Sequence, residues 1–474
     1  MISWAGCQQL EKSSEQESNE FIAGYPTDKA AATLFEEFDY QVAVQAYVWA
    51  TSAVNSIAVQ NAMQRDVGMK PGEMAFAIFN RQRPIQTIMT ANDEVVYIWP
   101  QFINTAKMGP VVLEVPAGTL GLSWDIFQRA LSDIGNLGPD GGKGGKYLYL
   151  PVGYDGEIPD GYFPVRLVYS DLFTAVVRTF PNDPKTGGLE GAIEQGKQIK
   201  MYPLSEATNP SPNRYIVMND KAFDADWPKD ERYFELLAEL INTDRAPSMA
   251  LSTVGNLRRL GIEKGKPFAP DARAQKILKR PAQTGHDIVR AIAFNNRFEN
   301  KLIYPDRQWE VIIHASDHQF MPGDVEEVEE RGSWYQLVGN AVKLAPSEPG
   351  TGIFYCVTYK DSDGDMLDGS NLYMIRMPAN VPVEQFWQIP VYSNQTRSLI
   401  NTGSPATKSS TEKLAKNDDG SVDIHFGPKA PSGGESNWIK TIPGEGWFVL
   451  LRLYGPKQVI LDKSWKPEDI RKTN

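Results

Sequence analysis

Apolar and polar residues alternate along residues 447–454, near the C-terminus. The odd-numbered positions from Trp447 to Leu453 are all apolar, whereas the even-numbered positions include Arg452 and Tyr454. Successive side chains of a β-strand point to opposite faces of the sheet. The pattern therefore predicts a strand with one face in a hydrophobic core. Its other face is expected to meet a half-polar cavity or a buried ion pair.

A long helix is predicted near the N-terminus, over residues 30–66. Apolar residues recur every three or four positions from Phe35 to Ile57, which places one apolar stripe along the helix. Thr27 and Asp28 are suitable capping residues for its start. The opposite side is also rather apolar, so we expect this helix to be covered on most sides.

Five short strands are predicted between residues 84 and 180, over 94–99, 111–115, 146–150, 162–167 and 173–178. Turn-forming residues separate them, most clearly in the glycine-rich run 138–145. Many short strands with turns between them are typical of a sandwich or barrel rather than of alternating strand–helix units.

Helical periodicity returns in the middle of the chain, around 234–241, 249–260 and 272–297, and Pro281 could interrupt the last of these helices. We expect residues 181–214 to form a long surface connection and 309–313 a short strand. The chain reads as β again from 352 to 459, with loops over 402–416 and 427–436.

These elements predict an α+β protein, mainly β with α additions, in which two β-sandwich domains are braced by helices. A chain of 474 residues is too long for one typical core, which fits two domains. We expect a disordered tether over 1–27, the N-terminal helix and first sandwich over 28–215, a helical segment and connection over 216–345, and the second sandwich over 346–474.

Charge and hydropathy exclude two classes of partner. The formal net charge is −11 and no long basic run occurs, whereas binding to nucleic acid or anionic lipid requires clustered Lys and Arg. No apolar stretch approaches ~18 residues, so the sequence predicts no membrane span. The two cysteines, Cys7 and Cys356, do not make a disulfide framework.

The N-terminus allows two interpretations. Small residues before Cys7 and a polar stretch after it are typical of a bacterial lipoprotein signal, but the usual apolar segment before them is missing. The first interpretation is a lipid anchor at Cys7 on a periplasmic or outer-envelope protein. The second is an ordinary tail of a cytoplasmic protein.

The sequence predicts no metal site and no cofactor. The acidic run 361–365 lacks the glycine and the final acid of an EF-hand loop. His314 and His318 are spaced like zinc ligands, but only two other histidines exist to complete a site. No serine-hydrolase elbow, zinc-protease helix motif, phosphate-binding loop or dinucleotide fingerprint occurs.

Motifs in both halves resemble a bacterial pair of families of unknown function, numbered 1254 and 1214. The N-terminal motifs are 38–50, 90–97, 109–116 and 138–148, and the C-terminal motifs are 367–370, 386–387, Tyr392, 419–421, 437–438 and 451–456. The resemblance runs from Tyr25 to Lys472. It implies two jelly-roll-like sandwiches in an often exported protein, and no established chemistry. Glu94 stands where the family usually has Asp.

Ionisable and aromatic residues within the predicted strands are the candidate site residues. If the protein is an enzyme, we expect a hydrolase or lyase using metal-independent acid–base chemistry. The candidate catalytic residues are Glu94, Tyr97, Glu114 and Arg452. The candidate ligand-binding residues are Asn92, Arg178, Trp387, Tyr392, Asn437, Trp438 and Tyr454.

Each candidate also has a structural interpretation. Arg178, Arg376 and Arg452 could pair with acidic residues inside the protein, and the tryptophans could fill the cores. The leading functional hypothesis is binding, and slow turnover, of a small or carbohydrate-like ligand in a cleft between the domains. The alternative is a non-catalytic envelope interaction or assembly protein that uses the sandwich faces. The sequence does not specify the oligomeric state.

Overall fold

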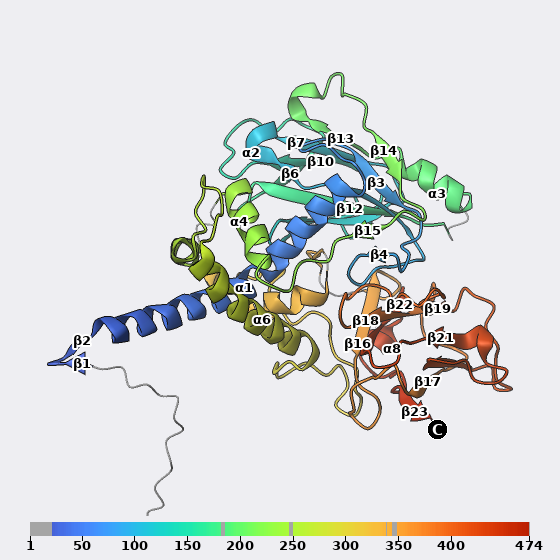
Figure 1. Cartoon of the computed structure of the whole chain (residues 1–474). Helices are drawn as coiled ribbons and strands as arrows, with labels where there is room; N and C mark the ends of the chain where they lie inside the picture. The colour runs from blue at the N-terminus through green and yellow to red at the C-terminus, as the bar shows by residue number, and fades with distance from the viewer. Residues whose placement is uncertain (1–20, 182–184, 246–249, 338, 344–347, 474) are drawn as a thin grey trace, which may run out of the picture.

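The computed structural model describes residues 21–181, 185–245, 250–337, 339–343 and 348–473. Two β-rich halves lie beside a group of helices, with the N-terminal half above the C-terminal half in Figure 1. The predicted α+β fold class is confirmed. Cys7 lies outside the described residues, so the lipid anchor stays a prediction.

The N-terminal half consists of two packed sheets. One sheet has the strand order β14–β3–β5–β12–β8–β9, with β6 beside β12, and the other has the order β11–β10–β7–β13. The strands are β3 (Phe76–Phe79), β5 (Val96–Pro100), β6 (Ile103–Asn104), β7 (Val111–Val115), β8 (Leu120–Asp125), β9 (Ala130–Ile134), β10 (Gly145–Leu150), β11 (Phe163–Arg166), β12 (Leu172–Thr179), β13 (Lys200–Pro203) and β14 (Tyr215–Val217).

The larger sheet is covered on both faces. Val96 and Ile98 on β5 point into the core between the two sheets, together with Leu113 of β7. Trp99 of β5 and Trp124 of β8 point the other way, into a core shared with the helices and the C-terminal half. Successive side chains of β5 therefore alternate between the core of the N-terminal sandwich and the core shared with the rest of the protein.

Helix α1 (Asp28–Arg65) packs on that second face. The hydroxyl of Thr27 accepts a hydrogen bond from the N–H of Ala30, which confirms the predicted cap. From Val42 to Met63 most residues are buried, so the expectation of cover on most sides is confirmed. By length and composition α1 could cross a membrane, but 83% of its most apolar window is buried inside the protein.

The first part of α1 projects away from the rest of the molecule (Figure 1). A short hairpin of β1 (Phe21–Ile22) and β2 (Tyr25–Pro26) lies at its far end. We call residues 21–41 the arm. The disordered tether was expected over 1–27, but within it β1 and β2 pair as a hairpin; residues 1–20 lie outside the described residues.

The remaining helices lie mainly beside α1 in the middle of the chain. Helix α6 continues through Pro281, because packing of the helix against α1 compensates for the backbone hydrogen bond that proline removes. The α-helices are α2 (Thr105–Met108), α3 (Gly188–Gly196), α4 (Tyr233–Thr243), α5 (Leu251–Leu257), α6 (Ala272–Phe294), α7 (Val328–Gly332) and α8 (Gln458–Leu461). Short 3-10 turns are η1 (Leu204–Glu206), η3 (Arg258–Leu260), η4 (Pro322–Asp324), η5 (Ser333–Gln336) and η6 (Glu435–Asn437).

The C-terminal half also packs two sheets face to face, with orders β16–β22–β18–β19 and β21–β20–β17–β23. Trp447 of β22 stacks on Phe426 of β20 in the core between them, with ring centroids 4.9 Å apart. The predicted apolar face of residues 447–454 is therefore confirmed. The strands are β16 (Ile353–Thr358), β17 (Leu372–Met377), β18 (Trp387–Ser393), β19 (Thr407–Ser409), β20 (Val422–Gly427), β21 (Trp438–Lys440), β22 (Trp447–Tyr454) and β23 (Arg471–Thr473).

Several sequence-based boundaries differ from the structure. The expected surface connection 181–214 contains α3, and β13, which completes the smaller sheet beside β7. The expected boundary at 215/216 falls inside β14, which pairs with β3. Likewise, β4 (Gln86–Thr87) pairs in parallel with the distant β15 (Phe223–Asp224). The expected strand 309–313 is reduced to isolated bridges, one of them between Glu310 and Val357. Local patterns miss such pairings because the partner strands are far away in the sequence.

Candidate functional site

A cavity of about 190 Å³ lies where the two halves meet. One wall is the helix-facing side of the larger N-terminal sheet, and a second wall is β16 and β22 of the C-terminal half. Mostly irregular segments between Ile312 and Lys343, together with the loop 88–91, form the remaining sides. The site is therefore built from segments that are far apart in the sequence.

The N-terminal wall presents one arginine and one tyrosine side by side. Tyr97 on β5 and Arg178 on β12 are cross-strand partners. The guanidinium carbon of Arg178 lies 5.5 Å from the centroid of the Tyr97 ring, which allows a cation–π contact. Trp99 and Val176, two residues away on the same strands, continue this wall as apolar surface.

The C-terminal wall repeats the arrangement. Arg452 on β22 and Tyr355 on β16 are cross-strand partners, and both line the cavity. Leu450 lies two residues away on the same face of β22. Each half thus contributes one arginine–tyrosine pair to the seam. The even-numbered face of residues 447–454, predicted to be half-polar, borders the cavity as expected.

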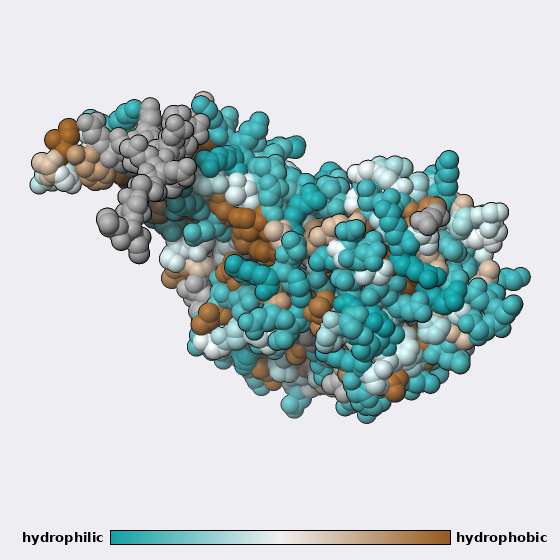
Figure 2. All heavy atoms as spheres, turned by 90° about the horizontal axis from the view of Figure 1, so that it is seen from below, coloured by the Kyte–Doolittle hydropathy of each residue, from teal (hydrophilic) through white to brown (hydrophobic). Residues whose placement is uncertain are grey.

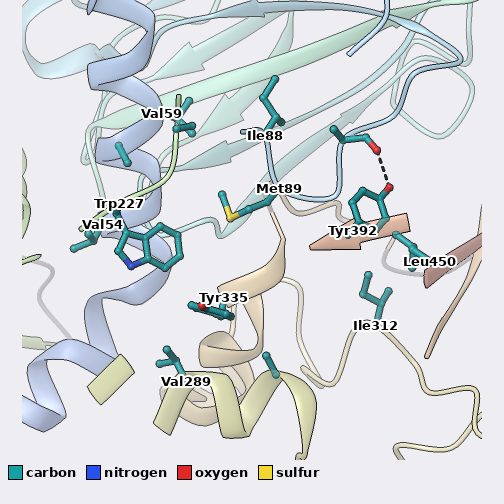
Figure 3. Close-up of a cluster of buried hydrophobic side chains, with 14 of the residues drawn as sticks. Val54, Val59, Ile88, Met89, Trp227, Val289, Ile312, Tyr335, Tyr392 and Leu450 are labelled. Atoms are coloured by element: carbon teal, nitrogen blue, oxygen red, sulfur yellow. Dashed lines mark hydrogen bonds between the residues drawn. The ribbon is translucent and has the colours of Figure 1, made fainter. Parts of the chain in front are cut away.

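Arg452 also holds the two halves together. Its Nη2 donates to the carbonyl oxygens of Thr90 (2.5 Å) and Ala91 (3.3 Å) and to the hydroxyl of Tyr392 (2.8 Å). The Tyr392 hydroxyl donates in turn to the Ala91 carbonyl at 2.7 Å, a bond drawn in Figure 3. The arginine is 4% exposed, so these bonds are shielded from water.

Further bonds fix the segment 90–93 against the C-terminal sheet. The amide of Asn92 donates to the Tyr454 hydroxyl at 2.6 Å, and Gln388 donates to Asp93 at 2.7 Å. The N–H of Thr90 donates to the Arg397 carbonyl. The motif 90–97 is therefore the N-terminal half's contact with its partner sheet, and Asn92 and Tyr454 serve this contact.

The two cavity arginines have no carboxylate partner within the described residues, which separates them from Arg376. Arg376 forms a bidentate pair with Asp423 at 2.7 and 2.9 Å, so its structural interpretation is confirmed. Arg178 has neither a hydrogen bond nor an ion pair there, and Arg452 bonds only neutral oxygens. The Nε atoms of Arg178 and Arg452 are both buried without a partner.

The neighbouring tyrosines do not supply the missing negative charge. Burial raises the pKa of Tyr392 and that of Tyr454 well above the ordinary value for tyrosine. Both hydroxyls therefore stay neutral at physiological pH and act as hydrogen-bonding groups. Asp93, a buried carboxylate behind the cavity, interacts with the charge of Arg452 without forming an ion pair with it, and burial raises the pKa of this carboxyl.

The remaining ionisable groups, Asp133 and Lys343, lie where the larger N-terminal sheet meets the third wall, which consists of the segments between Ile312 and Lys343. Asp133 of β9 accepts hydrogen bonds from the backbone N–H groups of Val342 (3.1 Å) and Lys343 (2.9 Å), and burial raises its pKa. Gly339 has a φ of 84°, and a Cβ there would meet the Trp124 ring at 3.0 Å. Glycine therefore permits this close approach of chain and indole.

Most of the lining is apolar. Figure 3 shows Ile88, Met89, Ile312 and Leu450 within one buried hydrophobic cluster, and all four line the cavity. Three indoles complete the lining: Trp99, Trp124 and Trp334. The arrangement combines an apolar chamber with two guanidiniums, which suits a molecule with an apolar body and a polar end.

Five predicted site residues lie away from the cavity lining. Glu94 precedes β5, and Glu114 on β7 accepts a hydrogen bond from the Tyr202 hydroxyl at 3.1 Å in the smaller sheet. Trp387 is buried at the start of β18. Asn437 bonds the backbone of Ala415 and Asp423, and the Trp438 indole donates to the Gly427 carbonyl. These bonds hold loops in place.

Tyr97, Arg178 and Arg452 are the predicted residues that line the cavity, and Asn92, Tyr392 and Tyr454 lie directly behind it. Tyr355 was not predicted as a site residue. It precedes the buried Cys356 on β16, so alternation places its side chain on the opposite face, which borders the cavity. The three indoles were not predicted either. Trp99 could have been, because it lies two residues after Tyr97 on the same strand and therefore on the same face. In the part of the chain that the structure describes, no group of three His, Cys, Asp or Glu side chains is placed to hold a metal ion.

The sequence matches two family models. Residues 75–203 match "Protein of unknown function (DUF1254)" and residues 352–458 match "Protein of unknown function (DUF1214)". The resemblance inferred from the motifs is thereby confirmed. The comparison with curated proteins found no match.

Two solved structures are similar to this chain. The crystal structure of the VPA0106 protein from Vibrio parahaemolyticus is 18% identical with a TM-score of 0.53, covering 92% of this chain and 100% of that one. An uncharacterized protein from Burkholderia cenocepacia is 12% identical with a TM-score of 0.40, covering 94% of this chain and 95% of that one. The first similarity supports the fold and says nothing of function.

Proposed function

We propose that this chain, which belongs to the DUF1254 and DUF1214 families, binds a small molecule in the cavity between its two halves. The observation that carries this proposal is the pair of arginine–tyrosine couples, one from each half, that border one apolar chamber. Arg452 is buried and Arg178 is partly buried, and holding such cations without an ion-pair partner is costly for a fold unless something binds to them.

The geometry favours binding over turnover. Acid–base catalysis requires a base within hydrogen-bond reach of the bound molecule. Among the described residues that line the cavity, Asp133 carries the one carboxylate, and two backbone N–H groups already bond to it. Glu94 and Glu114, the bases expected from the sequence, lie outside the lining. A small ligand held by Tyr97, Arg178 and Arg452 is therefore the proposal, and hydrolysis or elimination is not part of it.

Filling the cavity tests the proposal. Leu122 on β8 lines the chamber and is only partly buried, so tryptophan at this position can enter the empty space. We expect a thermal-shift screen of a chemically diverse small-molecule library to yield compounds that stabilise the wild type. Saturating ligand at 100 times its Kd adds about 2.7 kcal/mol of stability. Leu122→Trp should abolish that gain.

Val168→Trp is the matched control, because Val168 is 49% exposed and lies outside the lining. It should respond to the same compounds as the wild type. The proposal is wrong if no compound stabilises the wild type, or if Leu122→Trp responds as strongly as Val168→Trp.

A second candidate function is self-association through the arm. Phe21, Ile22, Tyr25, Leu34 and Phe35 are 40–76% exposed. Figure 2 shows hydrophobic residues at the tip of this projecting segment. Exposed apolar residues gathered on one element are typical of an interaction surface. Further along α1 lies a groove of about 350 Å³ that includes Val44, Val48 and Ile288. A second copy's arm is the occupant we propose for it.

Self-association predicts a concentration-dependent dimer. Phe35→Asp on the exposed side of the arm should convert it to a monomer, because a carboxylate cannot be buried in an apolar interface without a large desolvation cost. Light scattering after size-exclusion chromatography measures the change. The control is Val168→Asp, because Val168 is also an exposed apolar residue but lies away from the arm. This variant should stay dimeric. A wild type that is monomeric at all concentrations contradicts this second candidate.

A further inference from the structure

We infer that the ligand of the seam cavity is a small monocarboxylate with an apolar body about the size of one ring, its carboxylate held by Arg178 and Arg452. This inference rests on the proposed function and specifies its ligand class. It follows from three properties of the site: its charge, its size and its apolar lining.

The charge of the lining is opposite to that of the whole protein. The chain carries a formal net charge of −11, yet Arg178, Arg452 and Lys343 line the cavity against the single carboxylate of Asp133. Arg178 and Arg452 line the same cavity from the N-terminal and the C-terminal wall, so their positive charges disfavour each other. Acidic residues are abundant in the sequence, and none within the described chain forms a salt bridge with either arginine. An anion between them removes the repulsion and completes the unsatisfied donors.

Arg178 is the arginine best placed to respond to a ligand. The guanidinium of Arg452 is engaged with Thr90, Ala91 and Tyr392 across the seam. Arg178 makes no hydrogen bond within the described residues, and its Nε is buried. Its fork of N–H donors matches the two oxygens of a carboxylate. Tyr97 lies beside it on the next strand and adds a neutral hydroxyl to the same wall.

The size of the cavity limits the rest of the ligand. A cavity of about 150 Å³ accommodates benzene in a hydrophobic core, and the seam cavity measures about 190 Å³. One ring with a short acidic arm therefore fills it. The apolar wall of Met89, Leu122 and Trp124 faces that ring. A sugar ring would leave several hydroxyls against these side chains without partners, at a cost for each.

Isothermal titration calorimetry with matched probes tests the inference. Phenylacetate and phenylacetamide share a ring and differ in charge, and inorganic phosphate supplies charge without a ring. We expect the wild type to bind phenylacetate at least tenfold more tightly than phenylacetamide, and phosphate far more weakly than phenylacetate.

Arg178→Met should remove that preference. We expect it to weaken phenylacetate at least tenfold while leaving phenylacetamide unchanged, whereas Arg178→Lys should keep part of the preference. The variant should fold, because Arg178 contributes no hydrogen bond that methionine would break. Arg376→Met, which removes an exposed arginine paired with Asp423, is the control and should bind both probes as the wild type does.

Two results would overturn the inference while leaving the proposed cavity function intact. One is equal affinity for the acid and the amide, with both lost in Leu122→Trp. The other is no binding of either probe, although the library screen yields a compound that Leu122→Trp excludes. Phosphate binding as tightly as phenylacetate would also overturn it, since the apolar chamber would then contribute nothing. A failed library screen would instead end the proposed function itself.

Discussion

Replacing Arg397 with methionine is expected to lower the free energy of unfolding by about 3–5 kcal/mol, because it removes the fully buried partner of an ion pair together with its cation–π contacts and hydrogen bonds. Arg397 is fully buried, and its Nη2 lies 3.0 Å from Asp226 Oδ1. Its guanidinium carbon lies 4.3 Å from the ring centroids of both Trp227 and Tyr335. The substitution therefore removes a salt bridge and two cation–π contacts together.

The location of Arg397 makes this effect a test of how the halves are joined. Arg397 lies in the C-terminal half, whereas Asp226 and Trp227 follow β15, which pairs with β4 of the N-terminal half. The carbonyl of Arg397 also accepts the N–H of Thr90. Chemical denaturation followed by tryptophan fluorescence measures the loss. We expect the whole protein to be destabilised, since the residue links both halves.

Two further variants separate this interpretation from a general cost of losing arginine. Arg376→Met breaks the Arg376–Asp423 pair on the surface, where water screens the charges, so its denaturation midpoint should stay close to that of the wild type. Asp226 keeps Lys229 as an ion-pair partner at 2.9 Å in Arg397→Met, so adding Asp226→Asn should not restore the lost stability. Equal destabilisation by Arg397→Met and Arg376→Met would contradict the assignment.

The sequence predicted strand faces well because alternation is a local property. The pattern of residues 447–454 correctly separated the core face from the face at the seam. By the same rule, Glu94 and Tyr97 would lie on opposite faces of the strand predicted over 94–99, although the observed β5 begins only at Val96. The structure agrees in that Tyr97 lines the cavity and Glu94 does not. Glu94 and Glu114 were chosen as candidate bases by residue type rather than by position, and both lie outside the cavity lining.

Partners of charged residues could not be predicted from the same information. Arg178, Arg376 and Arg452 have similar apolar neighbours in the sequence, and all three were expected to find acidic partners. Arg376 does, because Asp423 on the neighbouring strand β20 is its cross-strand partner. Arg178 and Arg452 face Tyr97 and Tyr355 instead. Only the pairing of strands, a tertiary property, distinguishes the three.

The third wall of the cavity could not be predicted from the sequence either. Residues from Ile312 to Lys343 line it mostly with irregular chain, which has no hydrophobic period to recognise. Trp334 lies on the short turn η5, and the Gly339 backbone is placed by contact with Trp124. Such segments take their conformation from what they pack against, so the cavity's closure depends on both halves being folded.

A change of Asp244 to asparagine is expected to stabilise the protein at pH 7. Asp244 caps the end of α4 and is 3% exposed. Burial, opposed by hydrogen bonds, raises its pKa to about 6. Its Oδ1 accepts the N–H of Asp171 at 3.1 Å, whereas its Oδ2 is buried without a partner. Asparagine keeps the acceptor and removes the buried charge.

The raised pKa of Asp244 makes the stability of the wild type depend on pH. An unfolded aspartate has a pKa of about 3.9, so between pH 4 and pH 6 the folded protein holds a proton that the unfolded chain has released. This carboxyl therefore destabilises the fold by its full amount above pH 6, and the cost shrinks towards zero as the pH falls to 4. A difference of about two pKa units corresponds to roughly 3 kcal/mol at pH 7.

Denaturation curves of wild type and Asp244→Asn between pH 4 and pH 7 test this directly. We expect the variant to be more stable at pH 7 by up to about 3 kcal/mol and the two curves to converge near pH 4, where the wild-type carboxyl is protonated in the folded state. Asp160→Asn, at an exposed position, should follow the wild type throughout. Parallel curves for wild type and Asp244→Asn would mean that the carboxyl is charged in the fold. Its buried oxygen would then need a cation or water that the described side chains do not supply.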